Sequence, residues 1–210
     1  MKNLSGPVKV TEDVYWVGVN DRKTVRFENM WPLPYGISYN AYVIRTGAGY
    51  VAVDGVKEEF SEEYFSKLTA AVGDLRSIRY IVVNHLEPDH QGTLEELVSR
   101  TDARVIISNI GARMIGDFYD VPADRLLPVG DGQELEVGGK RLRFVSTPWL
   151  HWPETMVTLD ETDGVLFTCD VFGSYRALDV GLFDDEVPIE DYIPEAKRYF
   201  VNIVGKYSKN

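Results

Sequence analysis

An uninterrupted apolar stretch, residues 78–84, limits the possible folds of this chain more than any other segment. It reads Ile-Arg-Tyr-Ile-Val-Val-Asn, which has the length and the β-branched composition of a strand. Apolar and polar residues do not alternate in it, and this pattern indicates a strand that is buried on both faces. A chain that contains such a strand must place further layers of structure on both sides of its sheet.

The rest of the sequence predicts where those layers come from. A hairpin, then αβ units, then further strands and a helix favour an α/β (α+β) fold in which two mixed β-sheets pack face to face with helices outside. A doubly wound parallel sheet is the alternative on pattern alone. No linker-like tract divides the chain, so we expect one domain over residues 1–210. Strands are expected at 14–19, 40–45, 50–54, 104–108, 133–137, 141–145, 156–159 and 165–168, and helices at 58–72, 93–99, 109–119 and 193–206.

Charge and cysteine content exclude several classes of function. The formal net charge of -11 argues against nucleic acid or an anionic membrane surface as a partner. Cys169 is the single cysteine, so neither an internal disulfide nor a cysteine-based zinc site is expected. The N-terminal residues show no apolar signal segment, and no apolar run reaches the length of about 18 residues that a membrane span needs. We therefore expect a cytoplasmic protein without membrane or nucleic-acid partners.

Four candidate metal ligands lie within six residues directly after the buried strand. They are His85, Glu87, Asp89 and His90. His85 and Glu87 are two positions apart, whereas Asp89 and His90 are adjacent, so the two pairs can face different centres. A strand end is a suitable mount for ligands. The segment is therefore typical of a site for two neighbouring cations.

The spacing from Glu87 to His90 also matches the Glu-x-x-His motif of di-iron helix bundles. That interpretation needs a helix through Pro88, and proline costs about 3 kcal/mol in a helix interior. It also needs a second copy of the motif, which the sequence lacks. We therefore reject a helix bundle and expect a polar loop over 85–92.

Two further candidate ligands follow later strands. His151 lies in the segment Thr-Pro-Trp-Leu-His-Trp-Pro-Glu, and Asp170 ends a short apolar strand. A lone histidine in such surroundings is usually a packed residue, but a buried carboxylate needs a partner because burying it alone is costly. A position between two cations satisfies Asp170. We interpret the neighbouring Cys169 as a small core residue rather than a nucleophile.

Taken together, the six candidate ligands resemble in order and spacing the ligand pattern of flavodiiron proteins, whose metals lie in a domain of the metallo-β-lactamase fold. Similar segments occur at 39–42, 150–156, 170–174, 183–187 and 199–203, so the resemblance extends from end to end. It implies a metallo-β-lactamase-like αββα sandwich and two iron ions. By this resemblance, one iron is held by His85, Glu87 and His151, the other by Asp89 and His90, and Asp170 bridges the pair.

The resemblance implies a di-iron oxidoreductase that reduces dioxygen to water, nitric oxide to nitrous oxide, or both. Zinc hydrolases of this fold have a histidine where Glu87 stands, and a mixed set of imidazoles and carboxylates suits redox iron. Two alternatives remain. One is a di-iron protein that senses oxygen or iron without turnover. The other is a zinc-dependent hydrolase that uses a metal-bound hydroxide.

Flavodiiron proteins have one more histidine at the second iron and a flavodoxin-like domain that binds FMN, and neither occurs in these 210 residues. We therefore expect a domain that is incomplete at its C-terminal end. Electrons are expected from FMN in a partner domain or protein, with rubredoxin or a flavin reductase as possible donors. Because the relatives form head-to-tail homodimers, we also expect a homodimer.

Aromatic residues surround the expected site. The relatives have a tyrosine near the metals, and Tyr175 or Tyr199 is expected to supply it; the sequence does not choose between them. Four other aromatic residues either line the small-molecule pocket or pack around it, and the packing role in the core is expected: Trp149, Trp152, Tyr35 and Tyr39.

Overall fold

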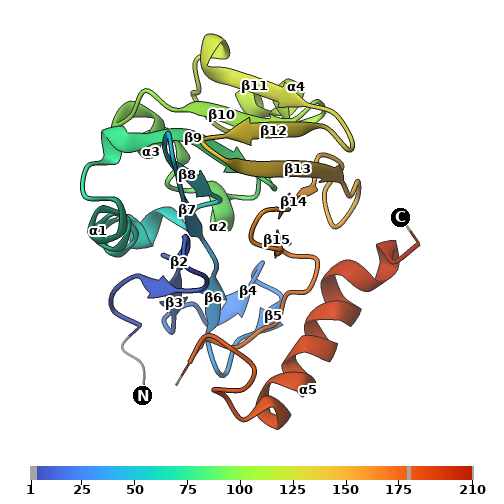
Figure 1. The fold of residues 1–210 in the computed structure, drawn as a ribbon. Helices are drawn as coiled ribbons and strands as arrows, with labels where there is room; N and C mark the ends of the chain where they lie inside the picture. The colour runs from blue at the N-terminus through green and yellow to red at the C-terminus, as the bar shows by residue number, and fades with distance from the viewer. Residues whose placement is uncertain (1–3, 179–180, 210) are drawn as a thin grey trace.

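The structure is a computed structural model that describes residues 4–178 and 181–209, and most of its strands belong to two sheets (Figure 1). The larger sheet has seven strands in the order β1-β2-β7-β8-β9-β10-β11. From β8 to β11 neighbouring strands are parallel, whereas the pairs formed by β1, β2, β7 and β8 are antiparallel. These strands are β1 (Val8–Lys9), β2 (Val14–Trp16), β7 (Tyr42–Thr46), β8 (Gly49–Val53), β9 (Ile78–Val83), β10 (Arg104–Ser108) and β11 (Leu126–Val129).

The smaller sheet has four strands in the order β12-β13-β14-β15 and is antiparallel throughout. The expectation of two mixed sheets therefore needs correction for this sheet. Its strands follow one another in sequence, and the connections between them are shorter than the crossover of about a dozen residues that parallel neighbours need. The strands are β12 (Glu134–Val137), β13 (Lys140–Ser146), β14 (Met156–Asp160) and β15 (Val165–Phe167).

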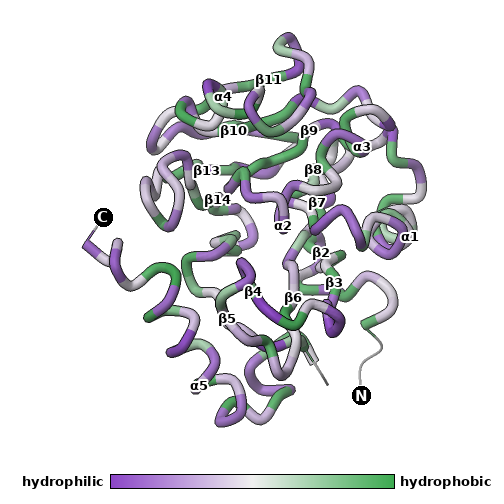
Figure 2. Tube along the Cα trace, turned by 180° about the vertical axis from the view of Figure 1, so that it is seen from behind, coloured by the Kyte–Doolittle hydropathy of each residue, from purple (hydrophilic) through white to green (hydrophobic). Residues whose placement is uncertain are grey.

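The two sheets face each other across one hydrophobic core, as the fold class predicts. The strand β9 shows how both faces of the larger sheet are used. Val82 points into the core between the sheets, and its neighbours Ile81 and Val83 belong to the core under the helices. Figure 2 shows the apolar character concentrated along central strands such as β10 and β13. The inter-sheet core contains Val14, Ile44, Val51, Val53, Val82, Ile106, Val129, Val137, Leu142, Phe144, Met156 and Phe167.

Helices cover the other face of the larger sheet (Figure 1). The helix α1 (Ser61–Val72) contributes Tyr64 and Leu68 to that core, and α3 (Leu94–Ser99) contributes Leu97. Two shorter helices are α2 (Pro88–Gln91) and α4 (Gly111–Met114). Single 3-10 turns occur at Glu58–Phe60, Leu75–Ser77, Ile115–Asp117, Ala123–Arg125 and Gly205–Tyr207.

A second body of structure lies below the sheets in the view of Figure 1 and consists of two small strand pairs and the C-terminal helix. The ring centroid of Tyr199, at the end of α5, lies 6.5 Å from that of Phe27 in β4, so the helix packs against the strand pairs. The elements are β3 (Val19–Asp21) with β6 (Ile37–Tyr39), β4 (Arg26–Phe27) with β5 (Trp31–Pro32), and α5 (Ile189–Tyr199), which continues as a π-helical turn at Phe200–Val204.

Several expected elements differ in extent. The strand expected at 14–19 divides into β2, which pairs with β7 in the larger sheet, and β3, which pairs with β6 in a separate strand pair. Between them, a Cβ at Gly18 would lie 2.3 Å from the carbonyl oxygen of Tyr39. The helix expected at 109–119 is only α4 and a 3-10 turn, and the C-terminal helix begins four residues earlier than expected, at Ile189. The strand β11 was not among the expected elements; it contains Pro128 and lies at the edge of the larger sheet, where proline is tolerated.

The outer face of the smaller sheet is charged. Arg143 lies 2.6 Å from both Glu134 and Glu161, and Leu166 on β15 is 47% exposed.

Within the described part of the chain, no helix combines the length and the apolar character needed to cross a membrane.

Candidate metal centre

The six candidate ligands come from three places that are distant in sequence and meet at one end of the two sheets. His85 and Glu87 follow β9, and Asp89 and His90 lie on α2, which begins at Pro88. The expected loop thus contains one helical turn, because proline is favourable at the first position of a helix, where no backbone N–H is needed. His151 lies in the connection from β13 to β14, and Asp170 follows β15.

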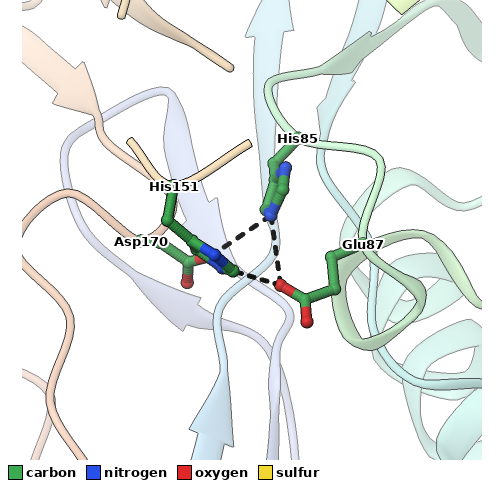
Figure 3. Close-up of side chains that lie close together, drawn as sticks. All are labelled: His85, Glu87, His151 and Asp170. Atoms are coloured by element: carbon green, nitrogen blue, oxygen red, sulfur yellow. Dashed lines mark hydrogen bonds and ion pairs between the residues drawn. The ribbon is translucent and has the colours of Figure 1, made fainter. Parts of the chain in front are cut away.

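One group of side chains gathers around Glu87 (Figure 3). Its Oε2 lies 3.1 Å from Nε2 of His85 and 2.9 Å from Nε2 of His151. The Oδ2 atom of Asp170 lies 3.6 Å from Nε2 of His85 and 3.5 Å from Nε2 of His151. All four side chains are buried or nearly so, and their ligand atoms are close enough to share one cation.

A second group lies on the other side of Asp170. Oδ1 of Asp170 lies 3.0 Å from Nε2 of His90, and Oδ1 of Asp89 lies 3.6 Å from the same nitrogen. Asp170 therefore turns one oxygen toward each group. Cys169 also lies close enough to His90 and Asp170 to share a cation with them, so it borders the site and is not the simple core residue that was expected.

Contacts between histidines and carboxylates keep these buried side chains charged. Burial alone lowers the pKa of His85, but its hydrogen bonds with Glu154 and Glu87 outweigh burial and raise the pKa to about 9. Burial likewise lowers the pKa of His151, but its contacts with the carboxylates of Asp170 and Glu87 outweigh burial and raise the pKa to about 10. Burial raises the pKa of Glu87, yet the two histidines lower it to about 2. The carboxylates thus favour positive charge at the positions of the imidazole nitrogens.

Cations fit this set of residues. Oδ1 of Asp89 and Oδ2 of Asp170 are buried and have no hydrogen-bond partner among the described residues. Buried polar atoms normally find a partner, so these two unpaired carboxylate oxygens suit cations. Three imidazoles and three carboxylates supply the nitrogen and oxygen ligands that first-row transition metals take.

Two buried carboxylates that support the site were not anticipated. Oε1 of Glu154 lies 2.7 Å from Nδ1 of His85. Asp54, directly after β8, accepts hydrogen bonds from the backbone N–H and the side chain of Asn84 and from the side chain of Gln91. Asp54 follows a strand as Asp170 does, so the same reasoning from strand ends applies to it; Glu154 carries no such signal.

The structure distinguishes the two candidate tyrosines. Tyr199 is buried, and its pKa is raised well above the usual value by burial and by the charge of Asp170. The ring of Tyr175 packs on that of Tyr199, with centroids 5.1 Å apart, one layer farther from the ligands. A cavity of about 40 Å³ adjoins the second group and is bordered by Phe27, Ile37, Tyr39, Asp89, His90, Asp170 and Tyr199.

The other expected aromatic residues divide into two kinds. The ring of Trp152 stands edge-on to the ring of His85 at a centroid distance of 5.2 Å, and Tyr39 is buried beside the cavity. Trp149 and Tyr35 are 49% and 51% exposed, so neither packs in the core as expected. Their sequence context resembles that of the buried rings, and only the course of the loops separates them.

Comparison with known proteins identifies the domain. A family model described as the ODP family beta lactamase matches residues 37–205. The chain is 37% identical to the anaerobic nitric oxide reductase flavorubredoxin of Aeromonas hydrophila, over 96% of this chain and 41% of that protein. It is 40% identical to the type A flavoprotein fprA of Rhodobacter capsulatus, over 96% of this chain and 48% of that protein.

Solved structures give the same picture. A flavo di-iron protein mutant from Thermotoga maritima superposes with a TM-score of 0.90 at 37% identity, over 97% of this chain and 51% of that one. Rubredoxin oxygen:oxidoreductase from Desulfovibrio gigas superposes with a TM-score of 0.91 at 28% identity, over 97% and 50%. The chain spans about half the length of these relatives. It belongs to the ODP family of beta lactamases, and the relatives that it matches are flavodiiron proteins.

Proposed function

We propose that this chain is the di-iron core of an oxidoreductase that reduces dioxygen to water, nitric oxide to nitrous oxide, or both. The observation that carries the proposal is the position of Asp170, which turns Oδ2 toward His85 and His151 and Oδ1 toward His90. One carboxylate between two groups of ligands is an arrangement that suits a pair of neighbouring metal ions.

In this proposal the first iron is bound by three side chains and the second by two, with Asp170 shared. When bound at these positions, two iron ions would supply the electrons that reduce a small molecule. Glu87 makes the first position more anionic than three histidines would, and mixed nitrogen and oxygen ligands suit iron. The assignment is His85, Glu87 and His151 for the first iron, and Asp89 and His90 for the second.

The size of the cavity supports a diatomic substrate. Its volume of about 40 Å³ is sufficient for a molecule the size of water or of a diatomic gas. Tyr39 and Tyr199 border the cavity, so their rings limit access by bulk water, and the hydroxyl of Tyr199 is available to a ligand.

The electron supply and assembly are part of the proposal. The names of the relatives, flavorubredoxin and type A flavoprotein, support FMN in a partner domain or protein as the donor, with rubredoxin or a flavin reductase upstream. A homodimer is proposed on the same resemblance. Exposed apolar side chains such as Trp149 and Phe200 would be buried at its interface. A cytoplasmic location is proposed because the single cysteine is free.

The test is a measurement of metal content followed by single-turnover and steady-state assays. The chain is loaded with Fe²⁺ anaerobically, and the consumption of dioxygen and of nitric oxide is followed with reduced rubredoxin plus a flavin donor. Two irons per chain and rapid consumption of either gas are expected. One reaction followed by arrest, with donor present, would instead favour an oxygen sensor. Hydrolysis of esters by a zinc-only protein that is inert with both gases would exclude the proposal.

A further inference from the structure

The carboxylate of Glu154 stands directly behind one of the candidate ligands. Its Oε1 lies 2.7 Å from Nδ1 of His85 and also accepts the backbone N–H of Leu86 at 2.9 Å. Glu154 is 2% exposed and His85 is fully buried, so water does not compete for this contact. Because a carboxylate only accepts hydrogen bonds, Nδ1 of His85 is the donor, and Nε2 is the atom that remains toward Glu87 and Asp170.

Glu154 is itself held in place by both sheets. Its backbone carbonyl accepts a hydrogen bond of 2.7 Å from the hydroxyl of Ser108, at the end of β10 in the larger sheet. Two residues later, the backbone N–H of Met156, which begins β14 in the smaller sheet, donates to the carbonyl of Asn84. These bonds fix the segment that carries Glu154 against the segment that carries His85, so their relative position does not depend on a flexible side chain alone.

The second group of ligands lacks this support. Nδ1 of His90 is buried and has no hydrogen-bond partner in the described part of the chain. Cys169, which lies close to His90, offers only a thiol, a weak hydrogen-bonding group. His85 and His90 therefore differ in the group behind the ring. A buried carboxylate accepts from Nδ1 of His85, whereas Nδ1 of His90 has no hydrogen-bond partner among the described residues.

We infer that Glu154 is a positioning residue that makes the His85 position the tighter of the two metal positions, so that it fills first. A hydrogen bond from the rear nitrogen of a ligating histidine to a carboxylate fixes the ring orientation and increases the basicity of the nitrogen that binds the metal. His90 gains neither effect. The inference rests on the proposed metal centre and adds an order of filling to it.

The experiment is a stepwise titration of the metal-free 210-residue chain with Co²⁺. Calorimetry measures the affinity for each equivalent, and visible absorption reports on the bound ion. Glu154→Gln keeps an oxygen that can accept from His85 and removes the charge, and Glu154→Ala removes both. The affinity for the first equivalent is expected to fall about 10-fold in the first variant and about 100-fold in the second. The absorption spectrum of the first bound ion should change, whereas the affinity for any second equivalent should stay within about twofold.

Asp160→Asn is the matched control, because Asp160 is also a fully buried carboxylate and accepts backbone hydrogen bonds from Thr162 and Asp163, away from the ligands. Circular dichroism of each metal-free variant reports whether it is folded. Equal Co²⁺ affinity in the wild type and both Glu154 variants would overturn the positioning role. The positioning role would also be overturned if the Glu154 variants lost Co²⁺ affinity equally for both equivalents and Asp160→Asn showed the same loss. If the wild type itself binds no Co²⁺, the proposed metal centre fails and the inference fails with it.

Discussion

At the scale of single residues, the chemistry of the site depends on how a few side chains share their atoms. Asp170 is the clearest case, because each of its oxygens faces a different group of ligands and it lies at the border of both. Glu87 is the second case, since one oxygen contacts two histidines at 3.1 and 2.9 Å. A change of one atom in either residue is therefore expected to affect more than one metal ligand.

Asp170→Asn tests the shared carboxylate. The amide nitrogen that replaces one oxygen cannot bind a cation, and the negative charge between the groups is lost. We expect metal content to fall from two ions per chain to one or none while the fold is retained. Elemental analysis after loading and desalting measures this, with Asp160→Asn as the control. Retention of two tightly bound ions by the Asp170 variant would contradict a bridging role.

Tyr199→Phe tests the hydroxyl beside the cavity. In the described structure this hydroxyl is buried without a hydrogen-bond partner, so its removal should change the free energy of unfolding by less than about 1 kcal/mol. Turnover is expected to fall about 10-fold, which corresponds to the loss of one hydrogen bond of about 1.4 kcal/mol in the reaction. Tyr175→Phe is the control, since its hydroxyl is equally unpaired but lies one ring farther from the ligands. Equal activity of the two variants would argue against a role for Tyr199.

At the scale of elements, the short helix α2 decides where Asp89 and His90 point. It is only one turn long, yet it is fixed closely against the rest of the chain. The N–H of Gly55 donates to the carbonyl of His90, and Gly92 follows the helix at a point of close backbone approach. The position of this turn therefore depends on its contacts rather than on helix propensity.

Gly92→Ala tests this dependence. A Cβ at this position would lie 2.3 Å from the backbone nitrogen of Glu58 and 2.8 Å from the carbonyl oxygen of Pro88, so backbone must move. Such overpacking is expected to cost about 1–3 kcal/mol of the free energy of unfolding and to weaken metal binding at the second position. Gly116→Ala is the control, because a Cβ there meets no atom within 4 Å. Denaturant unfolding and the Co²⁺ titration measure both effects; a Gly92 variant as stable as the control would disprove the close approach.

At the scale of the whole molecule, the two sheets bring three distant segments to one buried, charged site, and this couples stability to pH. In the metal-free chain the pKa of His85 is raised to about 9 and that of His151 to about 10, from an ordinary value near 6.5. Groups whose pKa rises on folding stabilise the fold fully below their unfolded pKa and lose that contribution as pH rises through the folded value. The pKa of Glu87 is lowered to about 2, so its stabilising contribution is fully present above about pH 4.5 and is lost only as pH falls toward 2.

We therefore expect the metal-free chain to lose stability steadily between about pH 6.5 and pH 10. Metal binding should show the opposite trend and strengthen as pH rises over the same range, because the metal competes with the protons on the histidines. Urea unfolding of the metal-free chain at several pH values, together with Co²⁺ affinity at the same values, checks both slopes. A metal-free stability that stays level or increases from pH 6.5 to 9 would contradict the proposed electrostatics.

Local pattern was sufficient for much of this molecule. The uninterrupted apolar run at 78–84 is β9, with alternate residues in two different cores, and the 3.6-residue period at 58–72 is α1 with the preceding turn. These predictions succeed because burial on one or two faces imposes a period on neighbouring residues. The types of the six candidate ligands were likewise readable in the sequence, and the structure brings all six together.

What only the tertiary structure decided depends on contacts between residues far apart. The sequence does not show that Asp170 faces two groups of ligands, that Tyr199 lies nearer than Tyr175, or that Glu154 stands behind His85, 69 positions away. Nor does it show that Trp149 is exposed while Trp152 packs on the site. Period and composition report on neighbours along the chain, whereas these relations follow from how two sheets and a short helix pack against each other.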